Sequence, residues 1–275
     1  MEIQKLSEHI GAQISEVDLA NLSEEEIADI KQAWLDHKVL VFRDQHISTP
    51  EHIAFGALFG DLEIHPFAEN LEAHPEVIVL EAGGDSPRQT YNAAKDWHID
   101  VSFREKPPMG SILRGKVIPE TGGDTCFSSS SAAYEKLDSD VKDRVDQLLA
   151  VNDYTKMFGP GTRFNDDDSH VENIKKYPPV LHPVIRTHPE TGGRSIFTNN
   201  FFTSHIDGVD ADESQYLLAQ LAEAIRDSSV QFRVKWETDT FVMWDNRCVH
   251  HVAMDDFLPL YRRMERVTIA GDRPF

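Results

Sequence analysis

Apolar residues recur every three to four positions in several segments of the chain, and this spacing predicts amphipathic helices. In segment 23–38, Ile27, Ile30 and Trp34 share one face, while Ser23 and the acidic residues after it suit a capped helix start. Pro50 near the start and Gly60 past the end delimit a second helix. The predicted helices cover 23–38, 49–60, 129–150 and 212–228.

Short apolar runs between these segments predict strands. They cover 39–42, 75–82, 111–118 and 238–246. Strands and helices do not alternate regularly, so a sheet sandwich or barrel with flanking helices fits better than a doubly wound sheet. Segment 152–181 is polar, with Gly and Pro early and a Pro pair late. We expect it to be a lid or insertion within a single domain of residues 1–275.

Two short words occur twice, HID at His98 and His205, and PETGG at Pro119 and Pro189. The first HID precedes its PETGG and the second follows it, so the repeats do not indicate an internal duplication. Gly-Gly after polar residues supplies the positive φ that a hairpin turn needs. We therefore interpret PETGG as a turn that is used twice.

The composition is that of a globular protein, with 40% apolar and 9% aromatic residues among 275. The net charge of −20 argues against nucleic acid as a partner, because phosphate binding requires clustered cations. No apolar run reaches the roughly 18 residues of a membrane span, and no secretory signal begins the chain. Two cysteines form no disulfide framework. These features predict a cytoplasmic protein in which any anion site must gather its own few positive charges.

The two HID triplets differ in their surroundings. In a strand, residues i and i+2 point to one face, so His98 and Asp100 in DWHIDVSF could both reach one metal ion. His205 and Asp207 run instead into Gly208 and an acidic stretch before a helix. We assign the first copy to a metal site and the second to turn and capping roles.

A metal at His98 and Asp100 needs a third ligand. The segment MWDNRCVHHVAM offers His250 and His251, which point to opposite faces of a strand, so only one can join. Two His and one carboxylate form the facial triad of non-haem Fe(II) oxygenases, but zinc hydrolases use the same donors. Satisfied structural histidines are a third interpretation of the same residues.

A cluster of arginines bears on this choice. Arg262, Arg263 and Arg266 lie in LYRRMERVTI, and on a strand Arg262 and Arg266 share a face while Arg263 points away. A surface ion-pair patch would explain such a cluster too. An inward arginine beside an iron site, however, suits a dicarboxylate cosubstrate, because a guanidinium holds a carboxylate through two parallel hydrogen bonds.

Four ordered motifs, WHIDVSF, PETGGDT, WDNRCVHH and LPLYRRMERVTIAGDRPF, resemble the taurine and 2,4-dichlorophenoxyacetate dioxygenase family of Fe(II)/2-oxoglutarate enzymes. IGAQI, LVFRDQ, FGDLEIHP and HPVIRTHPETG extend the resemblance over nearly the whole chain. The resemblance implies a double-stranded β-helix, or jelly roll, with helices packed outside. It also implies a homodimer or higher homo-oligomer.

The resemblance implies residue roles as well. In WDNRCVHH the family's metal ligand is His251, so His250 faces the other way. Thr125 and Arg262 correspond to the 2-oxoglutarate residues, and Arg266 to the arginine that binds the acidic group of the substrate. With O2, such an enzyme oxidatively decarboxylates 2-oxoglutarate to succinate and CO2 and hydroxylates a C–H bond.

Three further residues are candidate substrate contacts. His65 in EIHP corresponds to a substrate-contacting His of taurine-type enzymes, and Phe158 resembles a pocket aromatic. Phe202 is another candidate aromatic. For His65, a hydrogen-bonded loop histidine is the alternative.

Two positions depart from the taurine pattern. Ala68 stands where that pattern has Tyr, and Ala94 where it has Asn, for which Asn92 compensates only if the loop shifts. We therefore predict hydroxylation of a small anionic organic substrate, a sulfonate, sulfate ester or carboxylate, with a body different from or bulkier than taurine. A taurine dioxygenase proper and a catalytically silent metal- or small-molecule-binding protein on the same fold are the alternatives.

Overall fold

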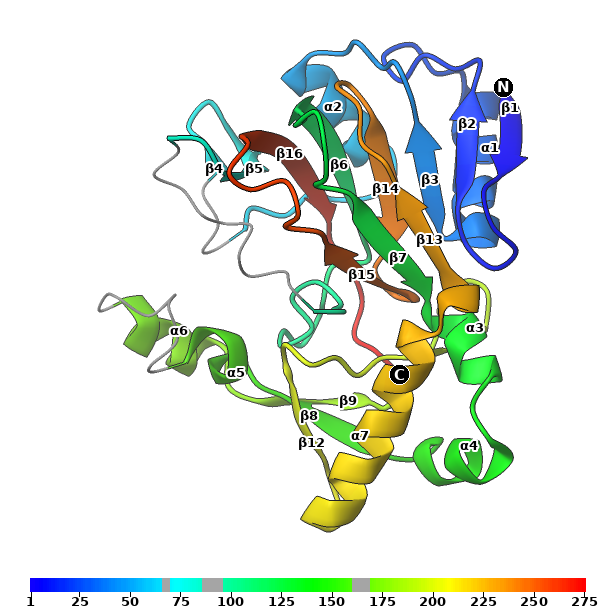
Figure 1. Ribbon diagram of the computed structural model, residues 1–275, viewed down its shortest axis with the longest axis vertical. Helices are drawn as coiled ribbons and strands as arrows, with labels where there is room; N and C mark the ends of the chain where they lie inside the picture. Colours follow the sequence, from blue (N-terminus) through cyan, green and yellow to red (C-terminus); the bar gives the residue numbers. More distant parts are fainter. Residues whose placement is uncertain (66–69, 86–95, 160–168) are drawn as a thin grey trace.

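A computed structural model describes residues 1–65, 70–85, 96–159 and 169–275 (Figure 1). The helices are α1 (Glu24–His37), α2 (Thr49–Ala57), α3 (Ser130–Glu135), α4 (Ser139–Val145), α5 (Thr155–Phe158), α6 (Ser169–Lys176), α7 (Ala211–Arg226) and the 3-10 helix η2 (Ser228–Val230). The strands are β1 (Glu2–Lys5), β2 (Ala12–Ser15), β3 (Val39–Phe42), β4 (Asn70–Leu71), β5 (His74–Ala82), β6 (Gly110–Val117), β7 (Thr125–Ser129), β8 (Leu149–Asn152), β9 (Val180–Pro183), β10 (Ile185–Thr187), β11 (Arg194–Ile196), β12 (Thr203–Ile206), β13 (Gln231–Val234), β14 (Phe241–Asp245), β15 (Val249–Ala253) and β16 (Arg262–Ile269).

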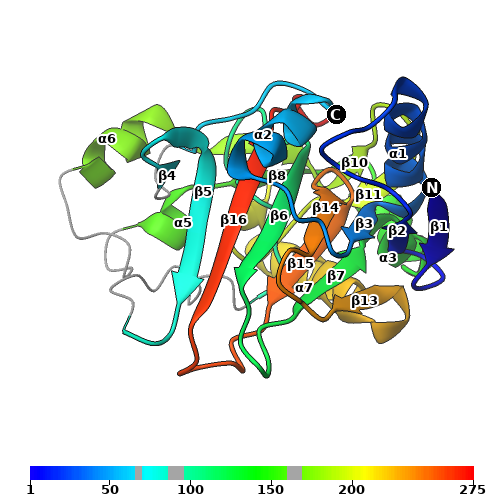
Figure 2. The ribbon, with the colours of Figure 1, turned by 90° about the horizontal axis from the view of Figure 1, so that it is seen from above.

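The largest sheet has eight strands in the order β1-β2-β3-β14-β6-β16-β5-β4, and its central strands are covered on both faces. Strand β3 shows this arrangement, because all four of its residues are buried. Leu40 and Phe42 join the core beneath α1 and α2, while Val39 and Val41 join the core on the opposite face. Figure 2 shows the two helices on one side of this sheet and β7, β13 and β15 on the other.

The second sheet, β13-β7-β15, packs across the core from the large sheet. Phe127 of β7 and Val249 of β15 meet Trp244 and Met264 of the large sheet in one buried cluster. The architecture is therefore two facing sheets with helices outside, as predicted at the level of a mainly β protein with flanking helices. Within the described residues the eight-stranded sheet stays open, with β1 and β4 at its edges.

A third core lies at the end of the sandwich. Helix α7 packs Leu217, Leu221 and Ile225 against α3, α4 and the small sheet β12-β8-β9. The Asp210 side chain caps α7 by accepting a hydrogen bond from the Glu213 backbone N–H at 2.8 Å. Strand β12, which lies beside α7 in Figure 1, is preceded by the loop of residues 197–202.

Most predicted elements are confirmed. Ser23 caps the start of α1, as expected, and it forms a capping box with Glu26; Ser48 forms an equivalent box with Glu51 at α2. The predicted helix over 129–150 is wrong, because that segment forms α3, α4 and the start of β8. Asp138 and Ser139 interrupt it, and both residue types favour helix starts over helix interiors.

The two PETGG turns connect their flanking strands in different ways. The second connects β10 and β11 as a hairpin, with Gly192 at φ +71°. The first does not form a hairpin: it carries the chain from β6 in the large sheet to β7 in the second sheet, with Gly122 at φ +73° and Gly123 at φ +75°. The predicted positive φ is therefore confirmed in both, and the predicted hairpin in one.

Across the described ranges, no helix has both the length and the apolar character that crossing a bilayer requires. Cys126 and Cys248 are both free thiols.

Candidate metal centre and cosubstrate site

Backbone pairing brings the first HID triplet to strand β15. His98 N–H donates to His251 O at 3.1 Å, and His251 N–H donates to His98 O at 3.0 Å. The two imidazole rings consequently lie 4.2 Å apart between centroids. Residues 153 positions apart in the chain thus present neighbouring ring nitrogens on one surface.

Asp100 places one carboxylate oxygen between these rings. Its Oδ1 lies 3.8 Å from Nε2 of His98 and 3.8 Å from Nε2 of His251. Its Oδ2 is engaged elsewhere, accepting from Arg266 Nη1 at 2.9 Å and from the Ser111 hydroxyl at 3.4 Å. The three side chains form a buried group that could hold a metal ion, with one oxygen and two nitrogens directed at it.

The local electrostatics suit a cation. Burial lowers the pKa of His98, and it lowers that of His251 well below the usual value, so both imidazoles are neutral near pH 7. Burial alone would raise the pKa of Asp100, but Arg266, followed by His251 and His98, holds it well below its usual range. His98 Nδ1 donates to Asp96 O at 2.9 Å, which leaves Nε2 with a lone pair toward the centre.

The route by which Asp100 reaches the centre differs from the expectation. WHIDVSF is not a continuous strand: only His98 pairs with β15, and the chain turns at Asp100. Val101 adopts φ +53°, a left-handed conformation that is unusual for a β-branched residue. The predicted convergence of His98 and Asp100 is therefore correct, but a turn and not strand alternation produces it.

The other candidate histidines lie elsewhere. His250 faces away from the centre, as predicted, accepting from the Ser130 hydroxyl and donating to Thr198 O, both at 2.8 Å. His205 is exposed on β12, and Asp207 follows in a turn before the cap of α7. The second HID triplet therefore takes no part in the group formed by His98, Asp100 and His251.

A second buried arrangement lies on β7 and β16. The Thr125 hydroxyl accepts a hydrogen bond from Trp236 Nε1 at 3.0 Å. The guanidinium of Arg262 lies 5.8 Å from the Trp236 ring and 5.9 Å from the Phe257 ring, and the side chain is fully buried. Gly123 gives it room, because a Cβ there would lie 3.0 Å from Arg262 Cδ. The structure thus brings Thr125 and Arg262 to one aromatic-walled niche.

Arg266 and His65 lie at the metal centre rather than in this niche. Arg266 shares a buried face of β16 with Arg262, while Arg263 is half-buried and pairs with Glu265 at 3.6 Å. Burial, followed by the charge of Arg266, lowers the pKa of His65 to about 4. His65 is therefore a neutral group beside the Arg266–Asp100 ion pair at pH 7.

The predicted aromatics Phe158 and Phe202 pack against Phe103, with ring centroids 6.2 and 4.9 Å away. An aromatic ring that does contact the metal group is Phe201, which stacks on His98 at 4.6 Å with an interplanar angle of 16°, while the Trp244 ring lies 4.9 Å from that of His251. Sequence reasoning missed Phe201, although it directly precedes a residue that was selected. Asn92, Ala68, Ala94 and part of the predicted lid lie outside the described residues.

Residues 2–268 match the family described as "Taurine catabolism dioxygenase TauD, TfdA family". The chain belongs to this family. Membership confirms the predicted enzyme class, a 2-oxoglutarate-dependent dioxygenase that uses Fe(II), 2-oxoglutarate and O2.

Individual members of the taurine dioxygenase family match along their length. An alkylsulfatase of Acinetobacter baylyi is 34% identical over 99% of this chain and 86% of its own. An (S)-phenoxypropionate/alpha-ketoglutarate-dioxygenase of Sphingobium herbicidovorans is 31% identical over 98% of this chain and 95% of its own. The crystal structure of a taurine dioxygenase from Burkholderia xenovorans superposes with a TM-score of 0.84 at 34% identity, covering 99% of this chain and 90% of that one.

Asp245 and Arg247 of the motif WDNRCVHH are both buried and form an ion pair with each other. Asp245 binds Arg247 through two side-chain hydrogen bonds, at 2.8 and 2.7 Å, and accepts from His188 Nε2 at 3.0 Å. Arg247 also pairs with Glu190 of the second PETGG turn at 2.5 Å. His188, Asp245 and Cys248 are close enough to resemble a metal group, but the carboxylate is already occupied by these ion pairs.

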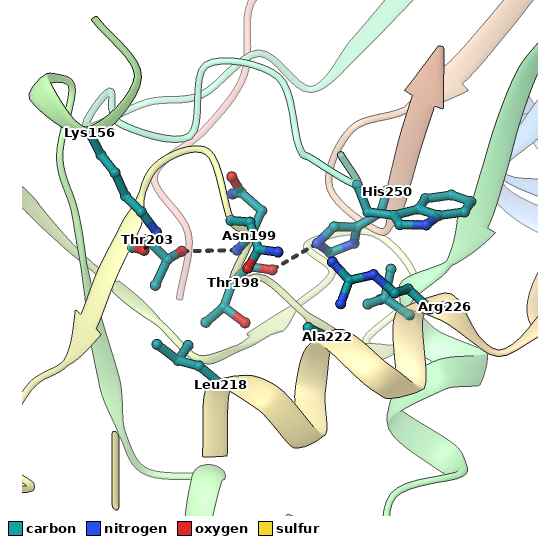
Figure 3. A pocket seen from close by; sticks show the side chains of 11 residues that line it. Lys156, Thr198, Asn199, Thr203, Leu218, Ala222, Arg226 and His250 are labelled. Carbon is teal, nitrogen blue, oxygen red and sulfur yellow. Dashed lines mark hydrogen bonds between the residues drawn. The ribbon is translucent and has the colours of Figure 1, made fainter. Parts of the chain in front are cut away.

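A small cavity lies behind the metal centre, between α7 and the loop before β12 (Figure 3). Thr198, Asn199 and Thr203 line one side, and His250 and Arg226 line another. Its volume of about 40 Å³ suits a few water molecules and is too small for an organic substrate. The cavity is thus a small space behind the site that polar and apolar side chains line together.

Proposed function

We propose that this protein is an Fe(II)- and 2-oxoglutarate-dependent dioxygenase that hydroxylates a C–H bond of a small anionic organic substrate. The observation that carries the proposal is the buried convergence of His98, Asp100 and His251, with a single carboxylate oxygen directed at two neutral imidazole nitrogens. Two His and one carboxylate leave coordination positions open for a cosubstrate and O2.

The donor set fits the metal. Bonds of about 2.1 Å from a first-row metal can span donor atoms 3.8 Å apart, and the three groups need no proton removed at pH 7. His98, Asp100 and His251 would hold the ion. Bound iron would supply the activation of O2 that couples decarboxylation of 2-oxoglutarate, giving succinate and CO2, to hydroxylation of the substrate.

Arg262 and Thr125 are the proposed residues for 2-oxoglutarate. A buried guanidinium can hold the far carboxylate of a dicarboxylate through two parallel N–H···O bonds, and the Thr125 hydroxyl accepts a hydrogen bond from Nε1 of the same Trp236. The aromatic walls exclude water, which strengthens a charge-assisted pair. A diacid cosubstrate would suit this niche, because its second charge would be the group that the niche binds.

Arg266 and His65 are the proposed contacts for the anionic group of the substrate. Arg266 uses Nη1 for Asp100, so only its remaining N–H groups could serve a substrate anion. Phe158, Phe202 and Asn92 are proposed as further contacts. Relatives named for alkyl sulfates and phenoxypropionate support a sulfate ester or carboxylate with an apolar body, and taurine itself is the alternative.

Finer features of the organisation are proposed as well. The facing sheets would be the two halves of a double-stranded β-helix, supported by likeness to the taurine dioxygenase structure. The chain would form one domain over residues 1–275, with a lid or insertion around 152–181. A homodimer or higher homo-oligomer and a cytoplasmic location are predictions that light scattering and fractionation would test.

The proposed function is tested by succinate release. Purified protein with Fe(II), ascorbate and 2-oxoglutarate is incubated in air with a panel of alkyl sulfates, alkylsulfonates, aryloxycarboxylates and taurine. We expect substrate-dependent succinate formation with an apolar sulfate ester or aryloxycarboxylate, and its loss in His98→Ala and Asp100→Ala.

His205→Ala is the matched control, because it removes the histidine of the other HID triplet from an exposed position. Iron-loaded protein that releases no succinate with any acidic candidate, or His98→Ala protein that retains full activity, would contradict the proposal.

A further inference from the structure

The side chain of Asn246 binds the backbone of Asp100 at both of its polar groups. Asn246 Oδ1 accepts from Asp100 N–H at 2.8 Å, and Nδ2 donates to Asp100 O at 3.0 Å. The second Nδ2 hydrogen goes to Pro108 O at 2.9 Å. Asn246 is fully buried, so both donor hydrogens and one acceptor site of its amide are satisfied by backbone groups.

These hydrogen bonds replace the backbone pairing that Asp100 would have in a regular antiparallel ladder. His98 and His251 exchange two backbone hydrogen bonds, and in a regular antiparallel ladder the next such pair would be Asp100 opposite Val249. The chain instead turns, with Val101 at φ +53°. The amide of Asn246 supplies the missing donor and acceptor, so it extends the ladder by one step into the turn.

This position controls where the carboxylate of Asp100 points. Arg266 and Ser111 hold only Oδ2, whereas the backbone of Asp100 determines where the whole side chain begins. Asn246 is itself held firmly, because its N–H donates to Met109 O at 2.9 Å and the flanking Asp245 and Arg247 form a two-bonded ion pair. A fixed amide thus connects the loop between β14 and β15 to the metal group.

We infer that Asn246 is a positioning residue for the metal centre, which fixes the backbone of Asp100 so that Oδ1 faces His98 and His251. The inference rests on the proposed function, in which these three residues bind the ion. Loss of a residue that orients a metal ligand typically weakens metal binding about 10- to 100-fold. We expect a loss of that size in Asn246→Ala.

The experiment measures metal binding and local backbone opening in the full chain. Mn(II) is titrated calorimetrically into the unchanged protein, Asn246→Ala and Val145→Ala, and hydrogen–deuterium exchange is followed by mass spectrometry. Val145 lies in the separate core of α3, α4 and α7, so Val145→Ala lowers the melting temperature without touching the metal group. Asn246→Ala should weaken Mn(II) binding about 10- to 100-fold and speed exchange in the peptide that contains Asp100.

Val145→Ala should bind Mn(II) as the unchanged protein does and exchange normally at Asp100. Asn246→Ala protein that binds Mn(II) within twofold of the unchanged protein would overturn the inference. Where Asn246→Ala does not fold, Asn246→Ser, which keeps a polar but shorter side chain, is judged by the same twofold criterion. Unchanged protein that binds no Mn(II), or a His98→Ala variant that binds it equally well, would overturn the proposed metal centre instead.

Discussion

Replacing Arg262 by Gln removes a positive charge from a place that water does not reach. The side chain is fully buried, with the Trp236 and Phe257 rings 5.8 and 5.9 Å from its guanidinium. Gln keeps hydrogen-bonding ability but cannot form the two-bonded ionic contact with a carboxylate. The expected result is a large loss of affinity for 2-oxoglutarate with the metal centre intact.

The size of this loss follows from the burial. Truncating one partner of a buried, hydrogen-bonded charge pair costs about 2 to 5 kcal/mol. At about 1.4 kcal/mol per tenfold change, that corresponds to a dissociation constant about 30- to 4,000-fold higher. The enclosed position of Arg262 favours the upper part of this range, because no solvent replaces the missing charge.

The assay is calorimetric binding of 2-oxoglutarate to Mn(II)-loaded protein without O2, supported by the 2-oxoglutarate dependence of succinate release. Arg263→Gln is the matched control, because Arg263 is the next residue of β16, is half-buried and faces the other way. An Arg262→Gln protein that binds 2-oxoglutarate within threefold of the unchanged protein would refute the assignment. Equal losses in both variants would refute it as well.

Three further changes test other parts of the structure. Gly123→Ala should lower stability by about 1 to 2 kcal/mol in urea denaturation, because φ is +75°, and should weaken 2-oxoglutarate binding, because its Cβ would crowd Arg262 at 3.0 Å. Burial lowers the pKa of His52 to about 3, so between pH 6.5 and pH 3 this side chain is protonated in the unfolded chain but not in the folded chain. The free energy of unfolding therefore decreases as the pH decreases through this range. At pH 5 this difference in protonation lowers the free energy of unfolding by about 2 kcal/mol. His52→Gln, which can still donate to Ile112 O, should therefore reduce the stability difference between pH 7 and pH 5 by about that amount. An unchanged difference would contradict the low pKa of His52. His205→Ala should leave Mn(II) affinity and turnover unchanged and stability within about 0.5 kcal/mol, and a weakened metal site there would contradict the assignment of the two triplets.

Local patterns in the sequence predicted the secondary structure correctly where all the signals lay within a single helix or strand. The capping box at Ser23 and the apolar face after it define α1, because both depend on residues within a few positions of each other. The same approach failed over 129–150, where apolar spacing continued through Asp138 and Ser139 although the helix ends. Apolar periodicity alone gives no weight to Asp138 and Ser139, two residues whose types favour the start of a new helix.

The sequence likewise predicted some residues of the candidate site and not others. Residue chemistry and the family motifs selected His98, Asp100 and His251, as well as Thr125 and Arg262, and the structure brings each of these groups together. Sequence reasoning missed Phe201, Asn246 and the partnership of Arg266 with Asp100.

The sequence by itself determined which residues carry metal-binding and anion-binding groups and on which elements most of them lie, because side-chain chemistry and strand or helix periodicity are local properties. Only the tertiary structure decided how Asp100 turns toward the histidines. Its partners Asn246 and Arg266 lie 146 and 166 residues further along the chain. Such contacts depend on how β14, β15 and β16 come together, and no spacing within a motif records that packing.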